Sequence, residues 1–167
     1  MSAPRPAEAV RLPRVSRKVT EPHFLASPAY VEHVNIAVKD LDKTVAFILA
    51  ALPDWRVRGQ GAVDWFGKPA RWLHIGTKTS YLALMDGGEG TGHNWTGHHV
   101  GLKHIGIVVP DVAALVERLV ATGHGPDHWG GSHPFRRSVY FIERDELQFE
   151  FIEYTSDAPA ERNDYSR

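Results

Sequence analysis

Cysteine is absent from the 167 residues of this chain. Disulfides, thiolate metal sites and a cysteine nucleophile are therefore excluded together. The sequence also has no apolar run of the roughly 18 residues that a membrane span needs, and its N-terminus lacks the continuous apolar stretch of a secretory signal. The formal net charge is only −1, so no excess of positive charge favours nucleic acid. We expect a cytoplasmic enzyme or binding protein that has neither a membrane nor a nucleic acid as its partner.

Histidine, by contrast, is plentiful, with 10 residues, and two of these histidines lie in an internal repeat. The stretch VEHVNIAVKD matches the stretch LKHIGIVVPD further along the chain. A shift of 71 positions aligns His33 with His104 and Asp40 with Asp111. In both copies a strand pattern runs directly into a helix pattern, and the aspartate stands where a helix N-cap belongs. The repeat therefore predicts two related modules.

Each module continues with short strands that are separated by turn signals. The predicted unit is βαβββ, which makes the protein α+β. Gly123 directly follows the second helix pattern, as the residue that ends a helix often does. The predicted segments are an extended or disordered N-terminal arm at 1–28, a first module at 29–86, a glycine-rich linker at 87–101, a second module at 102–155 and a polar C-terminal tail at 156–167.

Alternation along the strands separates the two faces of each predicted sheet. His33 and His104 lie opposite the branched aliphatic residues, which are expected to pack on the helix. Glu150, between two phenylalanines of the last strand, lies on the same face as the histidines. Buried imidazoles and carboxylates are costly unless they are paired or bound to a metal. Two histidines and one carboxylate form a ligand set that Fe(II) and related ions favour, so we predict one divalent metal ion held by these three residues.

A duplicated βαβββ module with these three residues resembles the vicinal oxygen chelate superfamily. That superfamily includes glyoxalase I, fosfomycin resistance proteins, extradiol dioxygenases, methylmalonyl-CoA epimerase and bleomycin-binding proteins. The resemblance covers Tyr30 to Tyr154 and implies a cupped mixed sheet around a metal site. The metal is expected to be Fe²⁺ or Mn²⁺, with Zn²⁺, Ni²⁺ and Co²⁺ as alternatives. Four-ligand members have Glu or Gln where this chain has Ala83, which favours the three-ligand members, the extradiol dioxygenases and fosfomycin-type transferases.

The stretch SHPFRRSVYFIERDELQFE in the second module resembles the extradiol dioxygenase signature. In that family a loop histidine and a strand tyrosine line the pocket as acid–base and hydrogen-bonding groups. The resemblance therefore implies catalytic roles for His133 and Tyr140. The chain departs from the family where the turn has Arg144 and Glu146 in place of proline and glycine.

Two further side chains are expected on the inward face of the strands and are predicted to bind substrate. Arg136 suits an anionic substrate group, because a guanidinium binds carboxylates in a bidentate way. His74 alternates with two aliphatic residues of its strand, so it is expected to contact substrate from the first module.

The sequence leaves the reaction open, because this fold carries many chemistries. The first hypothesis is an extradiol-dioxygenase-like oxidoreductase, in which a small substrate chelates the metal through two neighbouring oxygens and the metal acts as a Lewis acid. The alternatives are a glyoxalase-like lyase or isomerase, a fosfomycin-type thiol transferase, and a metal-free small-molecule-binding protein of the bleomycin-resistance kind. We also expect a homodimer, because sheets in such small modules leave edges that need covering. The glycine-rich linker permits the metal site to close either within one chain or, by exchange of modules, between two chains.

Overall fold

The computed structural model describes residues 29–90, 92–144 and 147–166 of the chain. The arm predicted at 1–28 lies outside these residues, as do residues 145 and 146 of the turn in the second module. The chain from Val31 onward forms one compact unit. None of the helices in the described residues is long and apolar enough to cross a membrane.

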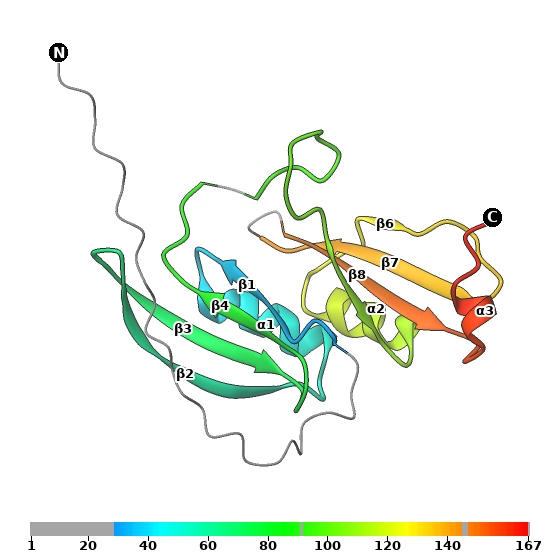
Figure 1. The fold of residues 1–167 in the computed structure, drawn as a ribbon, viewed down its shortest axis with the longest axis horizontal. Helices are drawn as coiled ribbons and strands as arrows, with labels where there is room; N and C mark the ends of the chain where they lie inside the picture. The colour runs from blue at the N-terminus through cyan, green and yellow to red at the C-terminus, as the bar shows by residue number, and fades with distance from the viewer. Residues whose placement is uncertain (1–28, 91, 145–146, 167) are drawn as a thin grey trace, which may run out of the picture. The chain divides into compact units, whose positions relative to one another are not determined.

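The first module is the predicted βαβββ unit (Figure 1). Its elements are β1 (His33–Ala37), α1 (Leu41–Ala51), β2 (Arg56–Trp65), β3 (Lys68–Gly76) and β4 (Tyr81–Met85). They form sheet A, with strand order β1-β4-β3-β2, in which β1 runs parallel to β4 and the other neighbours are antiparallel. The β2–β3 hairpin turns at Phe66 and Gly67, which both have positive φ, as two-residue hairpin turns of type I′ require.

The second module repeats this arrangement with shorter strands (Figure 1). Its elements are β5 (Ile105–Val108), α2 (Val112–Ala121), β6 (His128–Trp129), β7 (Arg136–Ile142) and β8 (Gln148–Tyr154). They form sheet B, with strand order β5-β8-β7-β6 and β5 parallel to β8. The α+β class with two βαβββ modules is therefore confirmed. A short helix, α3 (Pro159–Arg162), follows in the segment that was predicted as a polar tail.

The helix boundaries follow the predicted capping residues. Asp40 accepts a hydrogen bond from the backbone N–H of Lys43 at 3.1 Å, and Asp111 accepts one from that of Ala114 at 2.9 Å. Each aspartate thus satisfies one of the N–H groups that have no partner inside the first turn. Gly123 follows α2 with φ of 86°, the left-handed conformation that glycine adopts without a Cβ clash.

The helix sides of the two modules pack together into one hydrophobic core. α1 and α2 contact each other directly. The ring of Phe47 in α1 lies 5.5 Å from the ring of Phe149 in β8, and both side chains are fully buried. Burial of side chains of this size is a main source of folding free energy. Within one chain, each sheet therefore turns its helix side toward the other module.

Polar contacts reinforce the junction between the modules. Arg118 of α2 donates hydrogen bonds to the carbonyl oxygens of Ala50 and Ala51 at 3.1 and 2.9 Å. These carbonyls belong to the last turn of α1, where backbone acceptors lack intrahelical partners and a cation is favoured. The hydroxyl of Thr44 in α1 donates to a carboxylate oxygen of Glu143 at 2.7 Å, and both residues are buried. The contact between α1 and the second module is thus specific as well as apolar.

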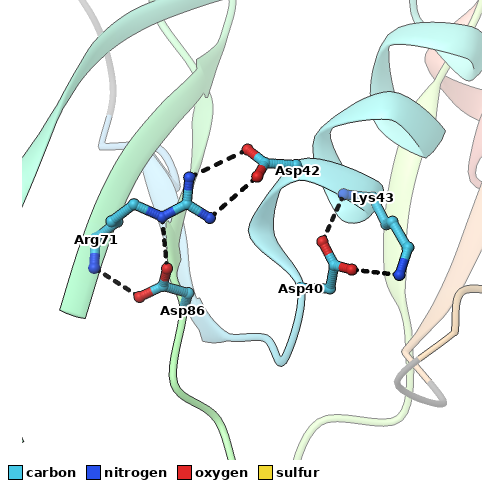
Figure 2. Close-up of polar contacts among 5 residues, drawn as sticks. All are labelled: Asp40, Asp42, Lys43, Arg71 and Asp86. Carbon is cyan, nitrogen blue, oxygen red and sulfur yellow. Dashed lines mark hydrogen bonds and ion pairs between the residues drawn. The ribbon is translucent and has the colours of Figure 1, made fainter.

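Arg71 of β3 ties sheet A to its own helix (Figure 2). Its guanidinium donates to Asp86, just after β4, at 2.7 Å and to both carboxylate oxygens of Asp42 in α1 at 3.2 and 3.3 Å. The backbone N–H of Arg71 also donates to Asp86 at 2.6 Å. The backbone and side-chain hydrogen bonds from Arg71 lower the pKa of Asp86. This exposed cluster links the first turn of α1 to β3 and to the end of β4.

Replacing Asp86 with asparagine is expected to lower the free energy of unfolding by about 1 kcal/mol at neutral pH, because charge-assisted hydrogen bonds are lost at a partly exposed site. A carboxylate with a lowered pKa contributes stability above its unfolded-state pKa of about 3.9 and loses it as the pH falls through the folded-state pKa. Urea unfolding should therefore show a lower free energy of unfolding for the variant at neutral pH, and this difference should vanish as the pH falls through the lowered folded-state pKa of Asp86. A difference that does not change with pH would contradict this assignment.

Candidate metal centre

Sheet B brings two of the three predicted ligands together. His104 directly precedes β5, and Glu150 lies in β8 beside Gly106 in the parallel pairing of these strands. His104 Nε2 is 3.3 Å from Glu150 Oε2, and the two side chains are 40% and 17% exposed. Gly106 places no side chain over the carboxylate. An imidazole nitrogen and a carboxylate oxygen thus converge on the face of sheet B opposite the core.

Tyr140 of β7 completes this corner of sheet B. It is the cross-strand neighbour of Glu150, and its ring meets the ring of His104 edge-on with centroids 5.6 Å apart. Burial raises the pKa of Tyr140 to about 12, and the hydrogen bond to Glu150 adds to this shift. The phenol therefore keeps its proton at neutral pH and donates it to the carboxylate in a hydrogen bond.

His33, the third predicted ligand, lies at the start of β1 in sheet A. Its ring stacks on Tyr81 with centroids 4.8 Å apart, and its Nδ1 lies 3.1 Å from a carboxylate oxygen of Glu32. In the part of the chain that the structure describes, no three side chains of histidine, aspartate or glutamate are grouped closely enough to hold a metal ion. The chain therefore brings His104 and Glu150 together without His33, and the three-residue centre stays a prediction.

The direction of the sheet faces explains this separation. In β1 and just beyond it Ile36 and Val38 are buried, whereas His33 and Asn35 are exposed. His104 is likewise exposed. Because the helix side of each sheet is used by the shared core, the histidine sides of the two sheets do not face each other within one chain.

The pairing of the strands places the two copies of the repeat in equivalent positions. Ala83 of β4 pairs with β1 on one side and with His74 of β3 on the other. Glu150 of β8 pairs with β5 and with Tyr140 of β7 in the same way. Ala83 therefore occupies in sheet A the position that Glu150 occupies in sheet B, and it has no side-chain atom that could bind a metal. His74 is the counterpart of Tyr140.

His133 and Arg136 contact the C-terminal segment. His133 Nδ1 accepts a hydrogen bond from the backbone N–H of Phe135 at 3.1 Å, and its Nε2 donates to the carbonyl oxygen of Asp164 at 3.0 Å. The guanidinium carbon of Arg136 lies 5.6 Å from the centroid of the Tyr165 ring. Both ring nitrogens of His133 are thus used by the main chain, which favours a structural role over the predicted catalytic one.

His128 of β6 lies at the same corner as Tyr140, although its sequence context predicted no role. Its ring stacks on Tyr140 with centroids 4.2 Å apart, and Trp95 of the linker stacks on His128 at 4.9 Å. His128 Nδ1 is 2.6 Å from a carboxylate oxygen of Asp127, which fixes the orientation of the ring. The adjacent Asp-His pair was the available signal, but the glycine-rich stretch around it shows no strand alternation.

A cavity of about 630 Å³ lies away from these residues. It is lined by the end of β1, the β2–β3 hairpin, the start of the linker and Leu147, and none of the predicted site residues belongs to its lining. The functional interpretation of the His104–Glu150 corner therefore rests on its chemistry and strand pairing rather than on this cavity.

Comparisons with known proteins agree on the family and the fold. The model of the Glyoxalase/Bleomycin resistance protein/Dioxygenase superfamily matches residues 30–151. No curated protein matches the chain in sequence. Among solved structures, a glyoxylase/bleomycin resistance protein/dioxygenase domain from Frankia sp. EAN1pec is 25% identical, with a TM-score of 0.60, and the match covers 77% of this chain and 99% of that one.

Two further structures share the fold at lower identity. A glyoxalase family protein from Bacillus cereus is 15% identical with a TM-score of 0.64, and the match covers 79% of this chain and 99% of that one. A mutant of the fosfomycin resistance protein FosX from Listeria monocytogenes, complexed with Mn(II) and 1S,2S-dihydroxypropylphosphonic acid, is 20% identical with a TM-score of 0.61. That match covers 81% of this chain and 98% of FosX.

Proposed function

This chain belongs to the glyoxalase/bleomycin resistance protein/dioxygenase superfamily, and we propose that it is a metal-dependent enzyme with a centre made by His33, His104 and Glu150. The observation that carries the proposal is the 3.3 Å approach of His104 Nε2 to Glu150 Oε2 on the open face of sheet B. Two imidazoles and one carboxylate fit a divalent first-row ion such as Fe²⁺ or Mn²⁺. The Mn(II) complex of FosX, which has the same fold, supports this choice of ion.

The centre is proposed to form between two chains of a homodimer, with His33 from one chain and His104 with Glu150 from the other. Support comes from the faces of the sheets, because the core of each chain uses both helix sides and leaves both histidine sides outward. A second copy can bring sheet A of one chain to sheet B of its partner. A symmetric pair of chains then forms two equal centres.

The roles of the protein's own groups follow from their contacts. A divalent ion, when bound, supplies Lewis acidity to two neighbouring oxygens of a substrate. Tyr140 orients Glu150 through its hydrogen bond and presents a protonated phenol at the centre. His128, held by Asp127, supports the ring of Tyr140 from one side. Ala83 leaves the equivalent position of sheet A free of a carboxylate, so substrate oxygens have room to approach.

Ring-opening oxygenation of a small vicinal diphenol is the reaction proposed first, because Tyr140 stands beside Glu150 and His104 as the extradiol resemblance implies. Thiol transfer to an epoxide is the second candidate. It is implied by the resemblance to fosfomycin-type transferases and is equally compatible with Ala83. The fold likeness to FosX, complexed with a dihydroxypropylphosphonic acid, supports a substrate of that size without indicating a thiol.

Metal analysis of protein purified without chelator, followed by turnover assays, tests the proposal. We expect close to one divalent ion per chain. With Fe²⁺ and air, consumption of catechol would support the dioxygenase assignment, whereas thiol-dependent loss of an epoxide with Mn²⁺ would support the transferase. Protein that binds no divalent ion and turns over neither substrate would contradict an enzyme function and favour a metal-free binding protein.

A further inference from the structure

A break in the pairing of β2 accompanies an arginine that lies over the ring of Tyr81. Val57 pairs with Ile75 and Gly59 pairs with His74, so Arg58 is an extra residue in β2 that has no partner in β3. A bulge of this kind re-aims side chains. The guanidinium carbon of Arg58 lies 4.3 Å from the centroid of the Tyr81 ring.

Tyr81 belongs to a row of rings on the same face of sheet A. It stacks on His33 with centroids 4.8 Å apart and lies 4.7 Å from the ring of His74. The ring of Trp72 lies 4.9 Å beyond His74. We call Tyr81, His74 and Trp72 the aromatic row; it joins β4 to β3 and is half-exposed. Packing the core does not explain it, because the core lies on the other side of the sheet.

Glycine residues of β2 make room for the indole of Trp72, which lies at the end of the aromatic row. A Cβ at Gly61 would lie 2.9 Å from Nε1 of Trp72, and a Cβ at Gly59 would lie 3.6 Å from the same indole. The indole therefore lies across β2 at a place where a side chain at position 61 would displace it. Strand β2 thus has glycines, without side chains, next to the indole of Trp72, and it has the cationic Arg58 at the bulge.

We propose that Arg58 and the aromatic row form the substrate subsite of the metal centre and that this subsite selects planar aromatic molecules bearing a carboxylate. The inference rests on the proposed function, because His33 connects the row to the metal. Half-exposed rings offer stacking surface to an aromatic ligand. A guanidinium stacked on a ring directs its N–H donors along its edge, where a carboxylate binds in a bidentate way. The subsite thus favours an aromatic acid over a neutral or aliphatic compound.

Calorimetric titration of the full-length protein tests this preference with four probes. 3,4-Dihydroxybenzoate is expected to bind roughly tenfold tighter than catechol, a ratio typical of one good charge-assisted contact. Benzoate is expected to bind tighter than cyclohexanecarboxylate. The Arg58→Gln variant should lose the preference for 3,4-dihydroxybenzoate over catechol. Retention of the acid preference in this variant, or its absence in the unmodified protein, would overturn the proposal.

The matched control is Arg56→Gln. Arg56 is two positions earlier on β2 and donates to the carbonyl oxygens of Pro53 and Trp55, so the control should keep the acid preference. Trp72→Leu should reduce the preference for benzoate over cyclohexanecarboxylate, and its thermal melt shows whether the chain is folded. If Trp72→Leu does not fold, Gly61→Ala, which only shifts the indole, is measured instead, and an unchanged aromatic preference would contradict the proposal.

Failure of the subsite and failure of the metal centre are distinguishable. Benzoate has one carboxylate and no vicinal hydroxyls, so its binding does not depend on chelation of a metal through two hydroxyls. The preference of the protein for benzoate over cyclohexanecarboxylate is therefore measured in the Glu150→Ala variant, where the proposed ligand set is incomplete. If this preference for benzoate is preserved and the unmodified protein binds no metal, the subsite is supported and the metal-dependent enzyme function is rejected. Metal-dependent turnover without any preference for aromatic acids would reject the subsite alone.

Discussion

Replacing Glu150 with alanine is expected to lower the affinity for a divalent metal by more than about 100-fold. Loss of a residue that only supports a metal ligand lowers the affinity by up to about 100-fold, and loss of a ligand should cost more. The reason is that Glu150 is the only anionic member of the proposed ligand set, with its Oε2 at 3.3 Å from His104 Nε2. The fold should survive, because the side chain lies on the open face of sheet B. Metal content after dialysis and the circular dichroism spectrum measure the two effects.

Glu153→Ala is the control for this prediction. Glu153 lies on the same strand, where it accepts hydrogen bonds from Arg137 at 2.7 Å and from the backbone N–H of Val112 at 2.9 Å. Its loss should cost some stability and no metal. Equal metal occupancy in both variants would show that Glu150 is not a ligand.

The second large effect is on folding. Phe47→Ala is expected to reduce the free energy of unfolding by about 3–5 kcal/mol, the usual cost of truncating a buried phenylalanine. Phe47 is fully buried and contacts Phe149 and His124 of the second module at ring distances of 5.5 and 5.1 Å. Urea denaturation should show the loss as one transition for both modules, because they share one core.

A phenylalanine at the surface provides the comparison. Phe66, at the tip of the β2–β3 hairpin, is 96% exposed, and Phe66→Ala should change the stability by less than about 0.5 kcal/mol. If Phe47→Ala does not fold, Phe47→Leu should still cost about 1 kcal/mol. A cost near zero for either Phe47 variant, or separate transitions for the two modules, would contradict the packing of α1 on the second module.

Much of the fold was predictable because the strands and helices of each module are indicated by patterns within short stretches of the sequence. The alternation that separates His33 from Ile36 depends only on the two-residue period of a strand. Asp40 and Asp111 begin helices because their carboxylates bond to the backbone within four residues. Alignment of the last strands of the two modules matches Ala83 with Glu150, and the strand pairing places the two residues at equivalent positions of their sheets.

The features that sequence patterns missed depend on contacts between distant segments. The bulge at Arg58 was not predicted, because β2 is largely exposed and lacks an apolar–polar alternation that an extra residue would interrupt. The hydrogen bond of His133 to Asp164 joins a loop to the C-terminal segment. The direction in which the modules pack is set by complementarity of their helix sides. For this reason the proposed ligand set stays a prediction from the sequence, and the separation of His33 from His104 and Glu150 within one chain was not predicted.

Mixing two inactive variants tests the central claim most directly, namely that each metal centre is shared between two chains. His33→Ala and Glu150→Ala chains are unfolded together, refolded at equal concentration, and assayed for metal bound per chain. In a dimer that shares its centres, each mixed pair contains one centre with both lesions and one centre with none, so roughly a quarter of the metal of the unmodified protein should return. If each centre is built within one chain, no intact ligand set can form and the mixture will hold no more metal than the separate variants.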